Sequence, residues 1–213
     1  MKNNITELVF ILDRSGSMSG LEDDAVGGFN STLENQKAQD GKVYVSTVLF
    51  DNFSEVIHDR IDINEIQPMT RSDYYVHGCT ALFDAVGDAI RHIANIHKYA
   101  RPEDVPEYTI FCIMTDGMEN ASYKYSRDNI KEKINHQIQK YGWEFIFLAA
   151  NIDAFEAAEH IGIPRNHVAN WSHSPSGMEL CHDAMNFAIT NARTNCSDTT
   201  NLDEYIKEKQ NKQ

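Results

Sequence analysis

The sequence predicts an α/β fold, a three-layer α/β/α sandwich whose central sheet is mostly parallel with one antiparallel edge strand. Continuous apolar runs at residues 8–12, 110–114 and 145–150 lack the alternation of a half-exposed strand, which is typical of strands covered on both faces. Segments with helical periodicity lie between these runs. Such an alternation of buried strands and helices indicates a parallel sheet between two helical layers.

The edge strand follows from a hairpin pattern. Residues 43–50 and 55–61 are two strand-like segments that flank the turn-rich sequence Asp-Asn-Phe-Ser at residues 51–54. A connection of this length joins antiparallel neighbours, whereas parallel neighbours need a longer crossover. We therefore expect these two segments to form an antiparallel pair at one edge of the sheet.

Helices are predicted where apolar residues recur at every third or fourth position. The predicted helices cover residues 82–97, 127–141, 154–161 and 177–192. Gly142 directly follows the second of them, and glycine tolerates the left-handed conformation that commonly ends a helix. A short apolar stretch at residues 168–171 separates the last two helices. Residues 66–79 and 99–108 are expected to be long loops, which are often functional.

The chain length and composition favour one domain. We predict a single domain over residues 1–195 and a solvated polar C-terminal tail over residues 196–213, where the sequence becomes polar and charged. The four cysteines lack both C-x-x-C spacing and the density of a disulfide scaffold, so we expect reduced thiols. They are Cys79, Cys112, Cys181 and Cys196.

Charge and hydropathy exclude several classes of partner. The net charge is -13, from 32 acidic and 19 basic residues, which opposes extended contact with nucleic acid or an anionic membrane surface. No apolar run approaches the ~20 residues of a membrane-spanning helix. The N-terminal sequence lacks the apolar length and the cleavage site of a signal peptide. We therefore expect a cytoplasmic protein.

Oxygen-bearing side chains follow two of the predicted strands and precede one predicted helix. Asp13, Ser15 and Ser17 come after the first apolar run, Thr80 precedes the helix at residues 82–97, and Asp116 follows the run at residues 110–114. In an open α/β sheet these positions meet at one edge. Two carboxylates there would repel each other unless a divalent cation bound between them. Carboxylates, hydroxyls and waters suit Mg²⁺ or Mn²⁺.

A purely structural interpretation uses the same residues. Asp13 and Ser15 would then cap a helix, and Asp116 would only turn the chain. The pattern Asp-x-Ser-x-Ser alone is weak, because it arises by chance in roughly one chain in twenty of this length. Its position after a buried strand, together with Thr80 and the sequence Thr-Asp-Gly after a second strand, favours the metal site.

Three motifs carry a resemblance to a known family. The sequences Asp-Arg-Ser-Gly-Ser-Met at residues 13–18, Gly-Cys-Thr-Ala-Leu at 78–82 and Thr-Asp-Gly at 115–117 resemble those of a von Willebrand factor A (VWA) domain, over roughly residues 5–195. The resemblance implies a Rossmann-like sandwich and a metal-ion-dependent adhesion site (MIDAS) completed by a partner's acidic side chain. It is closest to stand-alone bacterial members, some of which are associated with tellurite-resistance and stress operons.

The leading functional hypothesis is a metal-dependent protein–protein interaction module that binds an Asp or Glu of a protein partner. The chain has no Walker A or dinucleotide-binding sequence. If it works with an ATPase or a stress-response complex, we therefore expect it to act as an adaptor. Residues next to the ligands in sequence are expected to form the partner-binding rim of the site. They are Arg14, Met18, His77, Met118 and Glu119.

The alternative is an enzyme, a metal-assisted phosphatase or hydrolase that uses Asp13 as its nucleophile. That chemistry usually places an acid–base aspartate two residues later, whereas this chain has Ser15 there, so no catalytic residue is assigned. A serine hydrolase is excluded, because Met18 stands at the centre of Gly-Ser-Met-Ser-Gly, where the nucleophilic serine would have to be.

Overall fold

The computed structural model describes residues 4–194 and 201–211. Its six-stranded sheet has the order β3-β2-β1-β4-β5-β6, and all neighbouring strands are parallel except the pair β2–β3. The strands are β1 (Ile5–Asp13), β2 (Lys42–Phe50), β3 (Ser54–Asp62), β4 (Tyr108–Thr115), β5 (Glu144–Ala149) and β6 (Val168–Asn170). This confirms the predicted mostly parallel sheet and the predicted antiparallel hairpin, β2–β3, at one of its edges.

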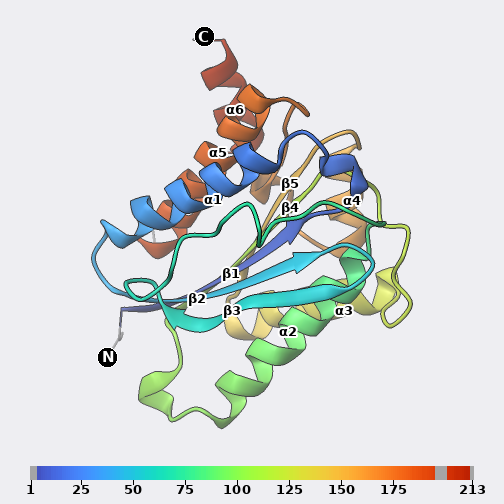
Figure 1. Ribbon diagram of the computed structural model, residues 1–213. Coiled ribbons are helices and arrows are strands. Elements are labelled where there is room, and N and C mark those ends of the chain that lie inside the picture. The colour runs from blue at the N-terminus through green and yellow to red at the C-terminus, as the bar shows by residue number, and fades with distance from the viewer. Residues whose placement is uncertain (1–3, 195–200, 212–213) are drawn as a thin grey trace.

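Helices cover both faces of the sheet (Figure 1). The helices are α1 (Glu22–Lys37), α2 (Leu82–Tyr99), α3 (Arg127–Tyr141), α4 (Ala154–Ile161), α5 (Pro175–Arg193) and α6 (Leu202–Gln210). One apolar core joins α1, α5 and α6 to the sheet, and a second joins α2, α3 and α4 to the opposite face. The three-layer arrangement is therefore confirmed. Among the described residues, no helix has the length and apolar character needed to cross a membrane.

Helix α1 is absent from the sequence prediction. Its buried side chains form a narrow stripe that includes Ala25, Phe29 and Leu33, and two consecutive glycines interrupt its polar remainder. The second glycine is required by packing, because a Cβ atom at Gly28 would lie 2.0 Å from the ring of His182 in α5. Helix α1 therefore packs through a close approach to α5 and not through a broad apolar face. A sequence pattern identifies a helix by such a face, so α1 was not predicted.

The expectation of a solvated tail is wrong for α6. Its Leu202 and Ile206 are only 3% and 2% exposed and belong to the core that α1 and α5 share. Tyr205 stacks on Phe187 of α5, with the ring centroids 4.4 Å apart. Three apolar residues suffice because they occur at helical spacing on one side of a polar helix. Residues 195–200, including Cys196, lie outside the described part of the chain.

The long segment between β3 and α2 is held against the sheet. The Asn30 side chain of α1 both donates to and accepts from the backbone of Met69, at 2.9 and 2.8 Å. The fully buried Tyr74 donates its hydroxyl to the carbonyl of Asp13, at the end of β1. These anchors bring the end of the segment, which carries Thr80, to the carboxyl edge of the sheet.

Candidate metal centre

The carboxyl ends of β1 and β4 lie side by side because the two strands are parallel neighbours, with Leu12 opposite Met114. Asp13 ends β1, and Asp116 directly follows β4. Thr80 lies two residues before α2 begins, at the same edge. A parallel sheet with crossover helices gathers its strand-to-helix loops in this way, which explains how distant segments meet.

Asp13 is fully buried and accepts two hydrogen bonds. The Ser15 backbone N–H donates to Oδ1 at 2.7 Å, and the Thr115 hydroxyl donates to Oδ2 at 2.5 Å. Burial raises the pKa of Asp13 from 3.8 to about 6, although these hydrogen bonds oppose the shift. The nearby Asp116 charge adds to it. The ionised carboxylate is thus held in position but lacks adequate solvation.

A chain of oxygens connects the two serines to Asp116. The Ser15 and Ser17 hydroxyls lie 3.1 Å apart, and the Ser17 hydroxyl donates to Asp116 Oδ1 at 2.5 Å. Burial is also the largest influence on the pKa of Asp116, and it raises that pKa. The structure therefore brings Asp13, Ser15, Ser17 and Asp116 into one cluster.

Gly117 shows that Thr80 belongs to the same cluster. A Cβ atom built on Gly117 would lie 3.5 Å from the Thr80 hydroxyl and 3.6 Å from the Ser17 hydroxyl. The Thr80 backbone also exchanges hydrogen bonds with Asn120, at 2.9 and 3.0 Å. All five residues predicted from the sequence as ligands thus gather at one edge of the sheet.

His173 is a member of this cluster that the sequence analysis missed. Its Nε2 atom lies 3.0 Å from the Ser17 carbonyl oxygen and 3.1 Å from Asp116 Oδ2. It makes its hydrogen bond with the carbonyl, which can only accept, so Nε2 carries the proton. His173 lies between β6 and α5, and no local motif marks it, because only the fold brings this loop to Asp116.

Asp116 Oδ2 is left without a hydrogen bond. Among the described residues it is a fully buried carboxylate oxygen that accepts no hydrogen bond, because the His173 Nε2–H, 3.1 Å away, bonds the Ser17 carbonyl instead. No three His, Cys, Asp or Glu side chains of the described residues group as a metal site, so the cluster would depend on its hydroxyls. Two poorly solvated carboxylates beside three hydroxyls fit a hard divalent cation such as Mg²⁺ or Mn²⁺.

Burial contradicts part of the expected partner-binding rim. Met18 is fully buried in the core beneath α1, and Arg14 is only 3% exposed, so neither can be a surface contact of a partner. The Glu119 carboxylate accepts from the backbone N–H groups of Phe83, Ala121 and Ser122, which fixes it as a local cap. Proximity to the ligands in sequence could not show which of these side chains point into the protein or bind its backbone and which are free to contact a partner.

Two expected rim residues do lie at the surface. The side chain of His77 is 49% exposed, and Met118 is 70% exposed directly after the Asp116–Gly117 turn. Whether they contact a partner stays a prediction. Their exposure agrees with their positions on the two loops that bring Thr80 and Asp116 to the edge.

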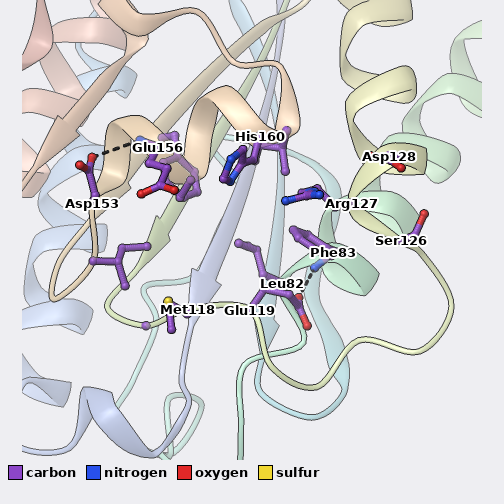
Figure 2. Close-up of a pocket in the computed structure, with 15 residues that line it drawn as sticks. Leu82, Phe83, Met118, Glu119, Ser126, Arg127, Asp128, Asp153, Glu156 and His160 are labelled. Atoms are coloured by element: carbon purple, nitrogen blue, oxygen red, sulfur yellow. Dashed lines mark hydrogen bonds between the residues drawn. The ribbon is translucent and has the colours of Figure 1, made fainter.

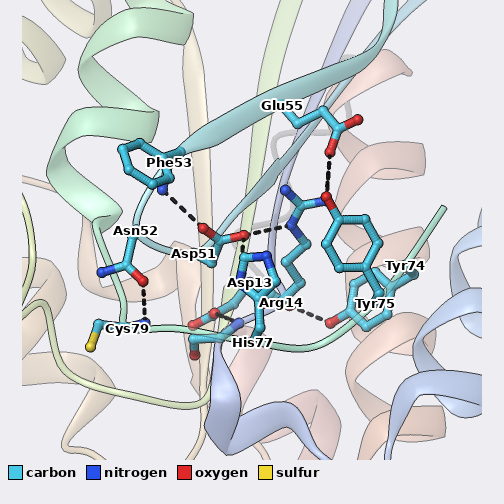
Figure 3. A network of polar contacts seen from close by, with 11 residues as sticks. Asp13, Arg14, Asp51, Asn52, Phe53, Glu55, Tyr74, Tyr75, His77 and Cys79 are labelled. Atoms are coloured by element: carbon cyan, nitrogen blue, oxygen red, sulfur yellow. Dashed lines mark hydrogen bonds and ion pairs between the residues drawn. The ribbon is translucent and has the colours of Figure 1, made fainter.

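Arg14 is the centre of a buried polar network that joins three segments (Figure 3). Its guanidinium donates to Asp51 Oδ2 at 2.8 Å and to Glu55 Oε2 at 2.6 Å. The Tyr75 ring lies over the guanidinium, 4.4 Å from the centroid. Asp51 Oδ1 accepts the Phe53 backbone N–H, which shapes the turn between β2 and β3. The network therefore connects the Asp13 loop with the hairpin and with the segment before Thr80.

The buried Asp13 carboxyl predicts a pH-dependent stability in the absence of metal. Because its pKa is higher in the folded than in the unfolded protein, its protonated form stabilises the fold below pH 3.8, and this contribution is lost as the pH rises to about 6. The loss amounts to about 3 kcal/mol. Urea unfolding in EDTA across this range should show the loss in the wild type and not in Asp13→Asn.

The exposed Asp183 on α5 gives the control for that experiment. Asp183→Asn removes the same charge at an exposed position outside the cluster and should keep the wild-type pH profile. Equal pH profiles of the wild type and Asp13→Asn would contradict the link between Asp13 burial and stability.

Comparison with known proteins shows similarity at the level of structure alone. No family model matches the chain, and no curated protein matches it. Among solved structures, the vWF domain of the type V pili tip protein Mfa5 from Porphyromonas gingivalis is 10% identical, with a TM-score of 0.62 over 87% of this chain and 95% of that chain. Manganese-loaded TRAP protein from Plasmodium vivax is 14% identical, with a TM-score of 0.54 over 84% and 73%.

A von Willebrand factor type A protein from Catenulispora acidiphila is 13% identical, with a TM-score of 0.56. The alignment covers 85% of this chain but only 41% of that protein, and the chain likewise spans 46% of a mussel byssus matrix protein. Identities this low establish architecture and not activity. The α/β sandwich of this chain, with its mostly parallel sheet and antiparallel edge strand, is a VWA-like fold.

Proposed function

We propose that this chain is a metal-dependent protein-interaction module. In this proposal Asp13, Ser15, Ser17, Thr80 and Asp116 hold Mg²⁺ or Mn²⁺ as an intact MIDAS, and an Asp or Glu of a protein partner completes the coordination shell. The observation that carries the proposal is Asp116 Oδ2, a buried carboxylate oxygen that accepts no hydrogen bond from the described residues, although His173 Nε2 lies 3.1 Å away. A cation would satisfy this oxygen and would offset the desolvation of both carboxylates.

The chemistry of the site also accounts for an acidic partner. Two carboxylates balance the formal charge of a divalent ion, and neutral hydroxyls leave coordination positions for other oxygens. The fold neighbour from Plasmodium vivax is a manganese-loaded protein, which supports the binding of a divalent ion by a VWA-like fold. The net charge of -13 would repel acidic surfaces at long range, so a partner with a basic surface and one protruding carboxylate fits best.

Catalysis has less support than binding. Asp13 is fully buried, and both of its carboxylate oxygens already accept hydrogen bonds, from Ser15 and Thr115. A nucleophilic carboxylate needs an exposed oxygen that can approach phosphorus. Ser15 occupies the position, two residues after the nucleophile, where such enzymes usually carry an acid–base aspartate. We therefore propose no enzymatic activity.

The wider biological role rests on the sequence motifs. We propose an adaptor in the cytoplasm, next to an ATPase or stress-response complex, in the manner of stand-alone bacterial tellurite-resistance-associated VWA proteins. Neither nucleic acid nor a membrane is part of this role. The sequences at residues 13–18, 78–82 and 115–117 support it.

The experiment that tests the proposal is protein capture under metal control. Wild-type, Asp116→Ala and Asp183→Asn proteins are immobilised and exposed to lysate of the source organism in Mg²⁺ or in EDTA. We expect partners that bind the wild type and Asp183→Asn in Mg²⁺ and that are lost both in EDTA and with Asp116→Ala. Partners retained in both perturbations, together with the absence of Mn²⁺ binding by calorimetry, would overturn the metal-dependent function.

A further inference from the structure

A cavity of about 650 Å³ lies between α3 and α4, beside the loop that follows Asp116 (Figure 2). Its volume falls within the ~300–1,000 Å³ of ordinary ligand pockets. The buried side chains of Leu82, Phe147 and Ile161 line it, and the half-buried Phe83 and Ile152 add to its apolar surface. An apolar cavity of this size on the surface is a candidate for binding a large hydrophobic group.

The cavity adjoins the loop that follows the proposed ligand Asp116. Gly117 and Met118, the two residues after Asp116, both line it. A partner whose acidic side chain reached the metal would therefore bring its neighbouring residues to the mouth of the cavity. The exposed Met118 lies between the two positions and offers a flexible apolar contact.

Arg127 at the start of α3 gives the cavity a cationic side. Figure 2 shows this side chain extending from α3 toward α4, where His160 lies. Each of the other seven arginines in the chain has a hydrogen-bond, ion-pair or aromatic partner. Among the described residues, Arg127 has no such partner. An unpaired guanidinium beside an apolar cavity favours a carboxylate as its ligand.

The acidic residues of the lining do not provide that carboxylate. Glu119 caps the backbone at the start of α2, and Asp153 accepts the first backbone N–H groups of α4. Glu156 is exposed, and Figure 2 places it toward the α4 end of the cavity, beyond His160 from Arg127. Asp128, the fourth acidic residue of the lining, is exposed, and Figure 2 places its carboxylate away from the Arg127 guanidinium, which extends toward α4. The Arg127 guanidinium therefore remains available to an anion.

We infer that this cavity is a second subsite for the protein partner and binds a large apolar side chain followed by an acidic residue. The apolar side chain enters between α3 and α4, and the acidic side chain pairs with Arg127. This inference rests on the proposed function, because it assigns the cavity to the partner that the metal centre would bind. It predicts that recognition requires two carboxylates, one at the metal and one at Arg127.

The test uses two matched dipeptides, N-acetyl-Phe-Glu-amide and its uncharged analogue N-acetyl-Phe-Gln-amide. Their binding is followed through the methyl NMR signals of Ile152 and Ile161, entirely in EDTA, so that no carboxylate can bind through a metal. We expect the acidic dipeptide to bind about five- to tenfold more tightly, because its charge-assisted hydrogen bonds to Arg127 are lost in the analogue.

Variants separate the two parts of the inference. Arg127→Gln should remove the preference for the acidic dipeptide, whereas Arg91→Gln, an exposed arginine on α2 outside the cavity lining, should keep it. Ala157→Trp, which fills the cavity, should abolish binding of both dipeptides, while Glu159→Trp, at an exposed position of α4 outside the lining, should leave it unchanged. Thermal unfolding of each variant checks that it is folded.

The outcomes decide the inference independently of the metal. Equal affinities of the two dipeptides, a preference that survives Arg127→Gln, or methyl signals that do not move would each overturn it. A protein that binds the dipeptides as expected but fails to bind Mn²⁺ would keep the cavity and lose the metal-dependent function. A protein that binds Mn²⁺ but does not bind the dipeptides as expected would keep the metal centre and lose the cavity subsite.

Discussion

Asp116→Ala is expected to weaken Mn²⁺ binding by at least about a hundredfold, because it removes one of the two carboxylates that would face the proposed ion in a partly dehydrated site. Asp116→Asn keeps the shape and loses the charge, so it should lie between the wild type and Asp116→Ala. Isothermal calorimetry measures both. Asp183→Asn, which removes an exposed charge from α5, should bind Mn²⁺ like the wild type.

The same change should appear in thermal stability. A cation at a hundred times its Kd stabilises the folded protein by about 2.7 kcal/mol, which corresponds to a Tm increase of roughly 5–10 °C for a domain of about this size. We expect this increase for the wild type in Mn²⁺ and at most about 2 °C for Asp116→Ala at the same Mn²⁺ concentration. An equal increase in both proteins would show that Mn²⁺ binds elsewhere and would contradict the assignment of Asp116 as a ligand.

Arg14→Met is expected to lower the free energy of unfolding by about 3–5 kcal/mol, because it leaves Asp51 as a buried carboxylate without its cation. Asp51 is only 1% exposed, and the Arg14 side chain 4%. Urea unfolding followed by circular dichroism measures the loss. The substitution should also weaken metal binding, since the Arg14 network connects the Asp13 loop to the segment before Thr80 (Figure 3).

Two further variants separate burial from charge. Arg91→Met removes an arginine from an exposed pair with Asp88 and should cost less than about 1 kcal/mol. The double variant Arg14→Met with Asp51→Asn removes both buried charges and should recover part of the stability that Arg14→Met loses. If the double variant were no more stable than Arg14→Met alone, the loss would come from packing and not from the unpaired charge.

The sheet could be predicted closely because β1, β4 and β5 are buried on both faces. β1, β4 and β5 appear in the sequence as unbroken apolar runs, and the β2–β3 hairpin is marked by its short polar turn. Helices α2 and α3 carry regular apolar periods. Each of these signals is local, and each agrees with the tertiary contacts that the element makes.

Helices α1 and α6 show where local pattern is insufficient. The fit of α1 against α5 depends on the absence of a side chain at Gly28, and the docking of α6 depends on a few apolar residues that find a core built by other segments. Neither requirement is visible within the helix itself. The apolar pattern of a helix shows how wide its apolar face is. It does not show how closely another helix packs against it.

The candidate metal residues were identifiable from the sequence because strand ends in a parallel sheet meet at one edge. Asp13, Ser15, Ser17, Thr80 and Asp116 could therefore be grouped without coordinates. Their environment could not be derived in this way. Burial depends on every segment packed around a site. That burial makes Asp13 a weaker acid and, among residues 4–194 and 201–211, leaves Asp116 Oδ2 without a hydrogen bond.

The sequence by itself determined the layered fold and the set of candidate oxygen ligands, because both depend on the order of strands, helices and polar residues along the chain. Only the tertiary structure decided which neighbours of those ligands are exposed. It buried Met18, paired Arg14 with Asp51 and brought His173 to Asp116. It also placed Arg127 beside a cavity, without a partner among the residues that the structure describes. These features arise between segments distant in sequence, where packing and desolvation and not local pattern set the outcome.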